Sequence, residues 1–175
     1  TLPEAMPNYK VIDGALRLQA REGATGTAAQ GKRVALVAAR FNTDIVDSMV
    51  VGAQAAWLRQ GGDPGSLLLV RVPGAFELPL AARRLAATGR FDAVVALGCV
   101  IRGDTAHFDF VAGEAARGIA AAARDTGVPV IFGVPTTENV EQAVERANPA
   151  RMDKGGEAME AALEMALVLA AIDSQ

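Results

Sequence analysis

Short apolar segments rich in β-branched residues alternate along this chain with longer, alanine-rich segments. Residues 32–39, 67–72, 91–97 and 128–134 have the length and composition of buried strands. The segments between them have the length and composition of helices. Strands separated by helices, with no hairpin signal, pair in parallel through right-handed crossovers and are covered on both faces. The pattern therefore predicts an α/β fold, a three-layer αβα sandwich around a four-stranded parallel sheet.

The N-terminal part of the chain differs from the rest. Residues 1–31 read as a tail, a short strand at residues 11–18 and a loop rich in Gly, Thr and Ala. Residues 32–175 carry all the alternating segments and are long enough to bury a core of their own. We therefore expect a single α/β domain over residues 32–175, preceded by an N-terminal extension.

Composition excludes several classes of function. The net charge of −3 gives no reason to expect nucleic acid or an acidic membrane surface as a partner. One cysteine rules out an internal disulfide, and with a single histidine it argues against a protein-built metal site. No apolar run reaches the ~18–20 residues that span a bilayer, and Glu4 and Pro7 argue against a signal peptide. We expect a cytoplasmic protein.

Four loops follow the carboxyl ends of the predicted strands, where ligands of parallel sheets bind. They are residues 40–42, 73–77, 98–107 and 133–139, and they carry the less common residue types, whereas the helices between them are plain. In the first turn, Asn42 or one of the two residues after it could cap the helix that runs to about residue 60. The pattern predicts a ligand site along this edge.

Residues 98–111 are the most informative of these stretches. They contain two glycines, Asp104 and Thr105 as candidate N-caps for a helix over residues 108–124, and His107, the only histidine in the chain. A strand that feeds a helix through such a loop favours an anion at the helix N-terminus. An imidazole beside it could move protons on a bound substrate. The alternative is a capped turn whose histidine lies at the surface.

Read together, the loops resemble the 6,7-dimethyl-8-ribityllumazine synthase family, which acts at the penultimate step of riboflavin biosynthesis. The motifs occur in the family's order and with similar spacing, from about residue 32 to the end of the chain. They are Arg40-Phe41-Asn42, Val72-Pro73-Gly74-Ala75-Phe76-Glu77, residues 98–111, Val130-Ile131-Phe132-Gly133-Val134, Thr136-Thr137-Glu138-Asn139, Glu141-Gln142-Ala143, Glu145-Arg146-Ala147 and Lys154-Gly155.

The resemblance implies a transferase that works without metal or organic cofactor. Its reaction condenses 5-amino-6-(D-ribitylamino)uracil with 3,4-dihydroxy-2-butanone 4-phosphate to 6,7-dimethyl-8-ribityllumazine, releasing phosphate and water. The proton-transfer residue that it implies is His107. The substrate-binding residues that it implies are Phe41, Ala75, Phe76, Glu77, Cys99, Val100, Ile101, Asp104, Thr105, Phe132, Arg146 and Lys154.

These roles suit the chemistry of the side chains. Phe41 and Phe132 would cover the flat pyrimidine, and Glu77 would accept hydrogen bonds from ribityl hydroxyls. Thr105 and neighbouring backbone N–H groups would hold the phosphate, with Arg146 as its cationic partner. Without the resemblance, core packing is the default for both phenylalanines. Glu77 would then serve only the helix dipole, and Arg146 would be a solvated helix-end cation.

Three positions depart from the family pattern. Cys99 stands where a Thr or another small residue is common, so a hydroxyl contact would be lost there. Asp104 brings a negative charge beside the expected phosphate and suits the site only if its side chain turns away to cap the helix. Pro135 stiffens the loop before residues 136–139. None removes a group that the reaction needs.

The resemblance also implies an assembly. The strand at residues 11–18 would join a neighbouring subunit's sheet, five subunits would close a ring, and each active site would lie between two of them. We expect a homopentamer, and the seven residues between Arg146 and Lys154 match members whose pentamers build a 60-subunit icosahedral shell. Riboflavin synthase is a further candidate partner.

Two other functions fit parts of the pattern. One is a flavodoxin-like module that binds a phosphate or nucleotide without chemistry, although Arg40-Phe41-Asn42 is a poor phosphate loop. The other is a shell-forming or flavin-binding relative that has lost activity. The candidate catalytic and binding side chains are all present, which favours an active enzyme.

Overall fold

The computed structural model describes residues 26–175 and centres on one parallel sheet. Its strands are β1 (Val34–Ala39), β2 (Leu67–Val72), β3 (Ala93–Leu97) and β5 (Val130–Gly133), in the order β2-β1-β3-β5. All three pairings are parallel. The four predicted strands are thus confirmed, each at or within two residues of its expected start. The strand expected at residues 11–18 lies outside the described residues.

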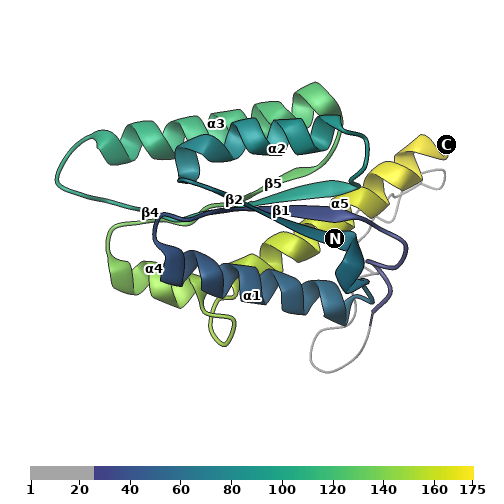
Figure 1. The fold of residues 1–175 in the computed structure, drawn as a ribbon, viewed down its shortest axis with the longest axis horizontal. Helices are drawn as coiled ribbons and strands as arrows, with labels where there is room; N and C mark the ends of the chain where they lie inside the picture. Colours follow the sequence, from purple (N-terminus) through teal and green to yellow (C-terminus); the bar gives the residue numbers. More distant parts are fainter. Residues whose placement is uncertain (1–25) are drawn as a thin grey trace, which may run out of the picture.

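Helices cover both faces of this sheet, as Figure 1 shows. α2 (Leu78–Ala87) and α3 (His107–Thr126) lie together on one face. α1 (Thr43–Arg59), α4 (Val140–Ala147) and α5 (Lys154–Asp173) lie on the other. The predicted three-layer αβα sandwich is confirmed. None of the helices within residues 26–175 combines the length and the hydropathy that a membrane-spanning segment requires.

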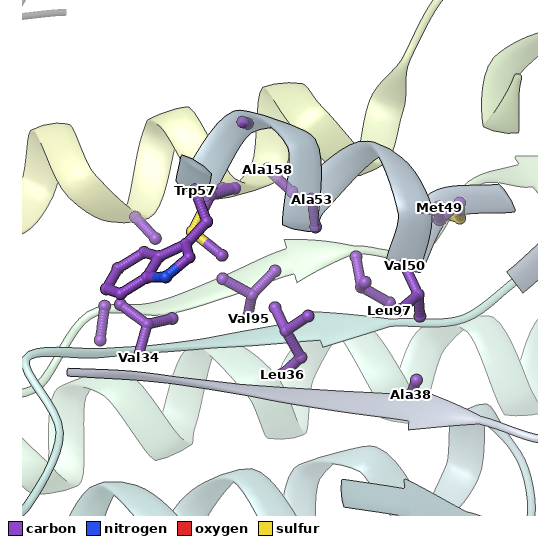
Figure 2. Packing of buried hydrophobic residues seen from close by; sticks show 14 of the residues in the cluster. Val34, Leu36, Ala38, Met49, Val50, Ala53, Trp57, Val95, Leu97 and Ala158 are labelled. Atoms are coloured by element: carbon purple, nitrogen blue, oxygen red, sulfur yellow. The ribbon is translucent and has the colours of Figure 1, made fainter. Parts of the chain in front are cut away.

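The core is divided into two layers because successive side chains of a strand point to opposite faces. On β1, Leu36 belongs to the layer under α1 and α5, whereas Val37 belongs to the layer under α2 and α3. Figure 2 shows the first layer, with the indole of Trp57 lying between α1 and the strands. Trp57 is fully buried, and its Nε1–H donates to the carbonyl of Asp63 at 2.9 Å. The polar atom of this large side chain is therefore satisfied.

Glycine allows α1 and α5 to approach closely. A Cβ at Gly155 would collide with the backbone carbonyl of Met49 in α1. Also in α1, a Cβ at Gly52 would meet the Asp153 carboxylate. That carboxylate caps α5 by accepting from the N–H of Gly156 at 3.1 Å. The position of the first turn of α5, which carries Lys154, is therefore set by contact with the backbone of α1.

Two further strands were not predicted. β4 (Val100–Ile101) and β6 (Thr136–Thr137) pair in parallel beyond the ends of β3 and β5. Two short 3-10 helices, η2 (Pro64–Ser66) and η3 (Ala75–Glu77), precede β2 and α2. Two- and three-residue elements carry no periodicity that a sequence pattern could reveal. The small sheet joins two of the loops in which ligand contacts were expected.

Candidate active site

A cleft of about 720 Å³ opens at the carboxyl ends of β1, β2 and β3. Its walls come from the turn after β1, the turn after β2, the segment after β3 and the first turn of α3. Nine of the predicted site residues line it, namely Phe41, Ala75, Phe76, Glu77, Cys99, Val100, Ile101, Thr105 and His107. Loops that are far apart in the sequence therefore meet in one concave site, at the edge where parallel sheets bind ligands.

The turn after β1 presents Phe41 to this cleft. Its backbone N–H donates to the carbonyl of Pro73 at 3.0 Å, which fixes the turn against the turn after β2. The ring is 72% exposed, so core packing, the alternative expected for it, is wrong. Asn42 follows in the left-handed region with φ 60° and ψ 45°. Its side chain makes no capping bond to α1, and its Nδ2 donates to the carbonyl of Cys99 at 3.1 Å.

The turn after β2 contributes an aromatic ring and a carboxylate. Phe76 is 57% exposed, and the exposed Glu77 stands immediately before α2. The N–H of Glu77 donates to the carbonyl of Gly74 at 3.2 Å and closes the turn. The Glu77 carboxylate therefore lies at a helix N-terminus, where an acidic residue stabilises the helix, and also at the cleft wall. One residue can serve both purposes.

The segment after β3 forms the buried wall. Cys99 is 4% exposed, and burial raises the pKa of its thiol to about 11. The N–H of Val100 donates to the carbonyl of Pro135 at 3.0 Å, as β4 pairs with β6. Backbone groups alternate between the two edges of a strand, so those of Ile101 lie on the edge away from β6. Peptide groups on that edge are available to a planar ligand.

His107 is the first residue of α3, one position earlier than the predicted start. The N-cap is Ala106, so Asp104 and Thr105 were wrongly predicted as caps, and no side chain caps this helix. Thr105 Oγ1 instead accepts a 3.4 Å bond from the N–H of His107. The turn is already helical at Ala106, which moves the N-cap past both polar residues. Apart from this 3.4 Å bond, the N-cap residue offers no side-chain acceptor to the first turn of α3, and such an N-terminus suits an anion.

The remaining predicted residues lie elsewhere in the chain. Phe132, Arg146 and Lys154 line a second hollow of about 330 Å³, between β5, α4 and α5. Phe132 is 45% exposed, so its alternative of plain core packing is also wrong. The Arg146 guanidinium donates to the carbonyl of Gln142 at 3.1 Å, and Lys154 Nζ pairs with Glu157 at 2.9 Å. Within one chain the predicted site is thus divided between two hollows.

Asp104 is exposed and belongs to neither the cleft nor the second hollow. Pro135 lines the second hollow beside Phe132. Across residues 26–175, no three side chains of His, Cys, Asp or Glu gather closely enough to hold a metal ion.

Besides the nine predicted site residues, the cleft wall includes Asn42, Pro73, Gly74 and Gly103 from the predicted loops. It also includes three residues of α3 that sequence reasoning missed, Phe108, Phe110 and Val111. Phe110 is 69% exposed although it is a large aromatic residue. The signal was present in the sequence, because Phe110 and Val111 lie three and four residues after His107. Such positions share one face of a helix. A helix that begins at the histidine therefore presents an apolar surface next to the imidazole.

The fold and the cleft define an α/β protein whose ligand site, built by the loops after its strands, joins aromatic rings, a carboxylate and one imidazole. The sequence profile of 6,7-dimethyl-8-ribityllumazine synthase matches residues 31–170. A protein of that name from Chlorobium phaeovibrioides is 50% identical over 150 residues, which cover 86% of this chain and 96% of the relative. Another, from Nitratidesulfovibrio vulgaris, is 50% identical over 141 residues, 81% of this chain and 90% of the relative. The chain belongs to the 6,7-dimethyl-8-ribityllumazine synthase family, transferase enzymes of riboflavin biosynthesis.

Proposed function

We propose that this protein condenses 5-amino-6-(D-ribitylamino)uracil with 3,4-dihydroxy-2-butanone 4-phosphate to give 6,7-dimethyl-8-ribityllumazine, phosphate and water. The observation that carries the proposal is the composition of the cleft. Exposed Phe41 and Phe76 rings, the Glu77 carboxylate and the His107 imidazole line one volume of about 720 Å³. A volume of this size suits a ligand with the dimensions of a substituted pyrimidine.

The reaction balances without an oxidant or a reductant. The 5-amino group adds to the ketone, and one water leaves as the imine forms. Loss of a proton from the adjacent carbon and departure of phosphate leave an enol, which becomes a new ketone. The ribitylamino nitrogen adds to that carbonyl, and a second water leaves as the ring closes. Every step moves protons, and His107 is the group in the cleft best suited to hold them near neutral pH.

The cleft residues divide between the two substrates. Phe41 would stack on the pyrimidine ring, and the peptide groups of Ile101 would meet its polar edge. Glu77 would accept hydrogen bonds from the ribityl hydroxyls. The phosphate would lie at the N-terminus of α3, against Thr105 and N–H groups of the first turn.

Proximity would supply most of the rate enhancement. Holding two reactants in a productive geometry can lower a barrier by up to ~7–11 kcal/mol in the best oriented cases, whereas acid–base assistance typically gives ~10²–10⁴-fold. The cleft offers a single imidazole and no cluster of acids and bases around it. We therefore expect a slow enzyme whose main work is to bring the two substrates together.

The second hollow would complete the site of a neighbouring subunit. Arg146 is the natural cationic partner of a phosphate, yet it lines a different hollow from Thr105 in the same chain. A head-to-tail ring would bring the second hollow of one subunit to the cleft of the next, and a closed ring satisfies every such contact. We propose a homopentamer with shared sites, in which Phe132, Arg146 and Lys154 serve the neighbour's cleft.

The edge of the sheet supports the same assembly. β2 is an edge strand, and it exposes Leu68 and Leu69 at 41% and 38%. Open edges with apolar side chains are normally covered. We propose that residues 11–18 of a neighbouring subunit add to this edge, that pentamers can build a 60-subunit shell, and that riboflavin synthase is a candidate partner of that shell.

Mixed assemblies test whether sites are shared. Phe41→Ala damages the cleft and Arg146→Ala the second hollow, so neither variant alone can form an intact site. If the two subunits are unfolded together and reassembled in equal amounts, roughly a quarter of the shared sites combine an intact cleft with an intact hollow. Activity well above the mean of the two parents is the expected result. Activity equal to that mean, or an active monomer in sedimentation velocity, would reject shared sites.

Product identification tests the reaction itself. Both substrates are incubated with and without the protein, and the product is identified by its mass, absorbance and fluorescence. We expect 6,7-dimethyl-8-ribityllumazine to form faster with the protein than in buffer. Phe41→Ala should bring the rate close to the buffer rate, because it removes the stacking surface for the pyrimidine. If the wild-type protein gave a rate equal to that in buffer, it would be a binding protein without this chemistry.

A further inference from the structure

Arg102 makes three side-chain contacts at the start of the segment that leads to His107. Its Nε lies 2.9 Å from Oε2 of Glu138, and a terminal nitrogen lies 3.7 Å from Oδ1 of Asp109. Its guanidinium carbon stands 4.5 Å from the centre of the Phe108 ring. The backbone N–H of Arg102 also donates to the carbonyl of Thr137 at 2.8 Å. One residue therefore contacts β6, the turn before α4 and the first turn of α3.

The segment that follows has few other attachments. Residues 103–106 are all exposed, and a Cβ built at Gly103 would meet no atom within 4 Å. Two hydrogen bonds join this segment to the first turn of α3, from the N–H of His107 to Thr105 Oγ1 and from the N–H of Asp109 to the carbonyl of Ala106. The turn is held to the sheet by the partly buried Phe108, which packs against the core layer under α2 and α3 and carries the Arg102 guanidinium over its ring.

The residues that Arg102 holds in α3 come directly after the histidine. Phe108 and Asp109 are the second and third residues of α3, and His107 is the first. A guanidinium that stacks on one of them and pairs with the other restricts both the position and the rotation of this turn. We propose that Arg102 is a positioning residue, which holds the His107 imidazole toward the cleft; this rests on the proposed role of His107 in proton transfer.

Direct contact with substrate is a poorer explanation of Arg102. The residue lines neither the cleft nor the second hollow. Two carboxylates and an aromatic ring already surround its guanidinium. A phosphate would have to displace at least one of these acidic partners.

The same guanidinium is also linked to α4 through Glu138, because the N–H of Glu138 donates to Gln142 Oε1 at 2.9 Å.

Steady-state kinetics of Arg102→Gln test the inference. Exposed ion pairs and a cation–π contact are each weak, so their joint loss should lower kcat by about 5- to 20-fold. The KM of the pyrimidine should stay within about twofold, since Phe41 and Glu77 remain. The KM of the butanone phosphate should rise, because Arg102 holds the turn whose N–H groups would bind the phosphate. Arg102→Lys, which keeps the charge, should recover part of the loss. Arg90→Gln is the matched control, because the Arg90 guanidinium also stands over a phenylalanine ring, that of Phe91. This pair precedes β3 and so lies at the amino ends of the strands, away from the cleft.

A double-mutant cycle separates positioning of His107 from a general effect on the fold. If Arg102 acts through the imidazole, Arg102→Gln should cause no further loss of kcat in a His107→Ala background. Fluorescence of Trp57, the only tryptophan and fully buried, should be unchanged in every variant. A further loss of kcat in that background, a shift in Trp57 emission or a raised KM for the pyrimidine would overturn the inference. If the wild-type protein forms no lumazine, the proposed function itself fails.

Discussion

The side-chain amide of Asn42 donates a hydrogen bond to the backbone carbonyl of Cys99 at 3.1 Å. These residues are 57 positions apart, and the bond joins the turn after β1 to the end of β3. Because Phe41 immediately precedes Asn42, the bond sets the distance between an aromatic wall of the cleft and its backbone wall. The left-handed conformation of Asn42 makes this possible, because the side chain then reaches across to β3 and does not cap α1.

Loss of this amide should weaken binding of the pyrimidine. Asn42→Gly keeps a residue that adopts the left-handed conformation easily, and it removes the donor. A hydrogen bond contributes about 0.5–1.5 kcal/mol net, so the KM of the pyrimidine should rise roughly 2- to 13-fold. The KM of the butanone phosphate should change little. Equal changes in both KM values would mean that Asn42 only stabilises the fold.

His107→Ala should slow turnover without abolishing it. If proximity supplies most of the acceleration, the variant keeps the bound geometry and loses the ~10²–10⁴-fold that a positioned acid–base group typically contributes. Substrate affinity should change little, because the phenylalanines that would stack on the pyrimidine and the N–H groups that would bind the phosphate remain. Single-turnover kinetics measure this directly. An unchanged rate would remove His107 from the mechanism.

Arg146→Ala should affect one substrate far more than the other. Hydrogen bonds to charged groups contribute about 1.5–3 kcal/mol, so the KM of the butanone phosphate should rise about 10- to 150-fold. The KM of the pyrimidine should stay nearly constant. Arg151→Ala is the control, since Arg151 is exposed in the following loop and outside both hollows. Equal effects on the two substrates would indicate a structural role for Arg146.

Cys99 should resist alkylation in the folded protein. Its thiol has a pKa of about 11, raised by burial from an ordinary value of 9.0. At pH 8 the thiolate fraction should therefore be about 100-fold lower in the folded than in the unfolded chain, which slows reaction with iodoacetamide by at least that factor. Between these two pKa values the folded state binds more protons than the unfolded state, so stability falls as pH rises from about 9 to about 11. Rapid alkylation of native protein at pH 8 would contradict the burial of this wall.

Much of the fold follows from the sequence, because buried parallel strands and long helices have strong patterns. β2 has the predicted limits. Asn139 is the N-cap of α4, and its Oδ1 accepts from the N–H of Gln142 at 2.8 Å, as is usual for this residue type. Prediction of the helix caps failed at Asn42 and before α3. The Asn42 side chain binds the carbonyl of Cys99, a contact between distant residues that no local pattern can reveal.

The candidate site was predictable as a set of residues and less so as an arrangement. Loops after parallel strands must meet at one edge of the sheet, which brought Phe41, Glu77 and His107 together in one cleft. The spacing of residues along the chain does not show on which side of the sheet a loop residue will lie. Arg146 therefore lines a separate hollow, set by the packing of α4 and α5. Only three-dimensional packing shows that one chain leaves the two groups apart.

The most direct test of the proposed chemistry measures both products at once. Wild-type protein is mixed with both substrates, and lumazine fluorescence and free phosphate are recorded together against a reaction without protein. The condensation predicts that lumazine and phosphate appear at the same accelerated rate, with one phosphate released for each lumazine formed. Phosphate release without lumazine, or a lumazine rate no faster than in buffer, would contradict it.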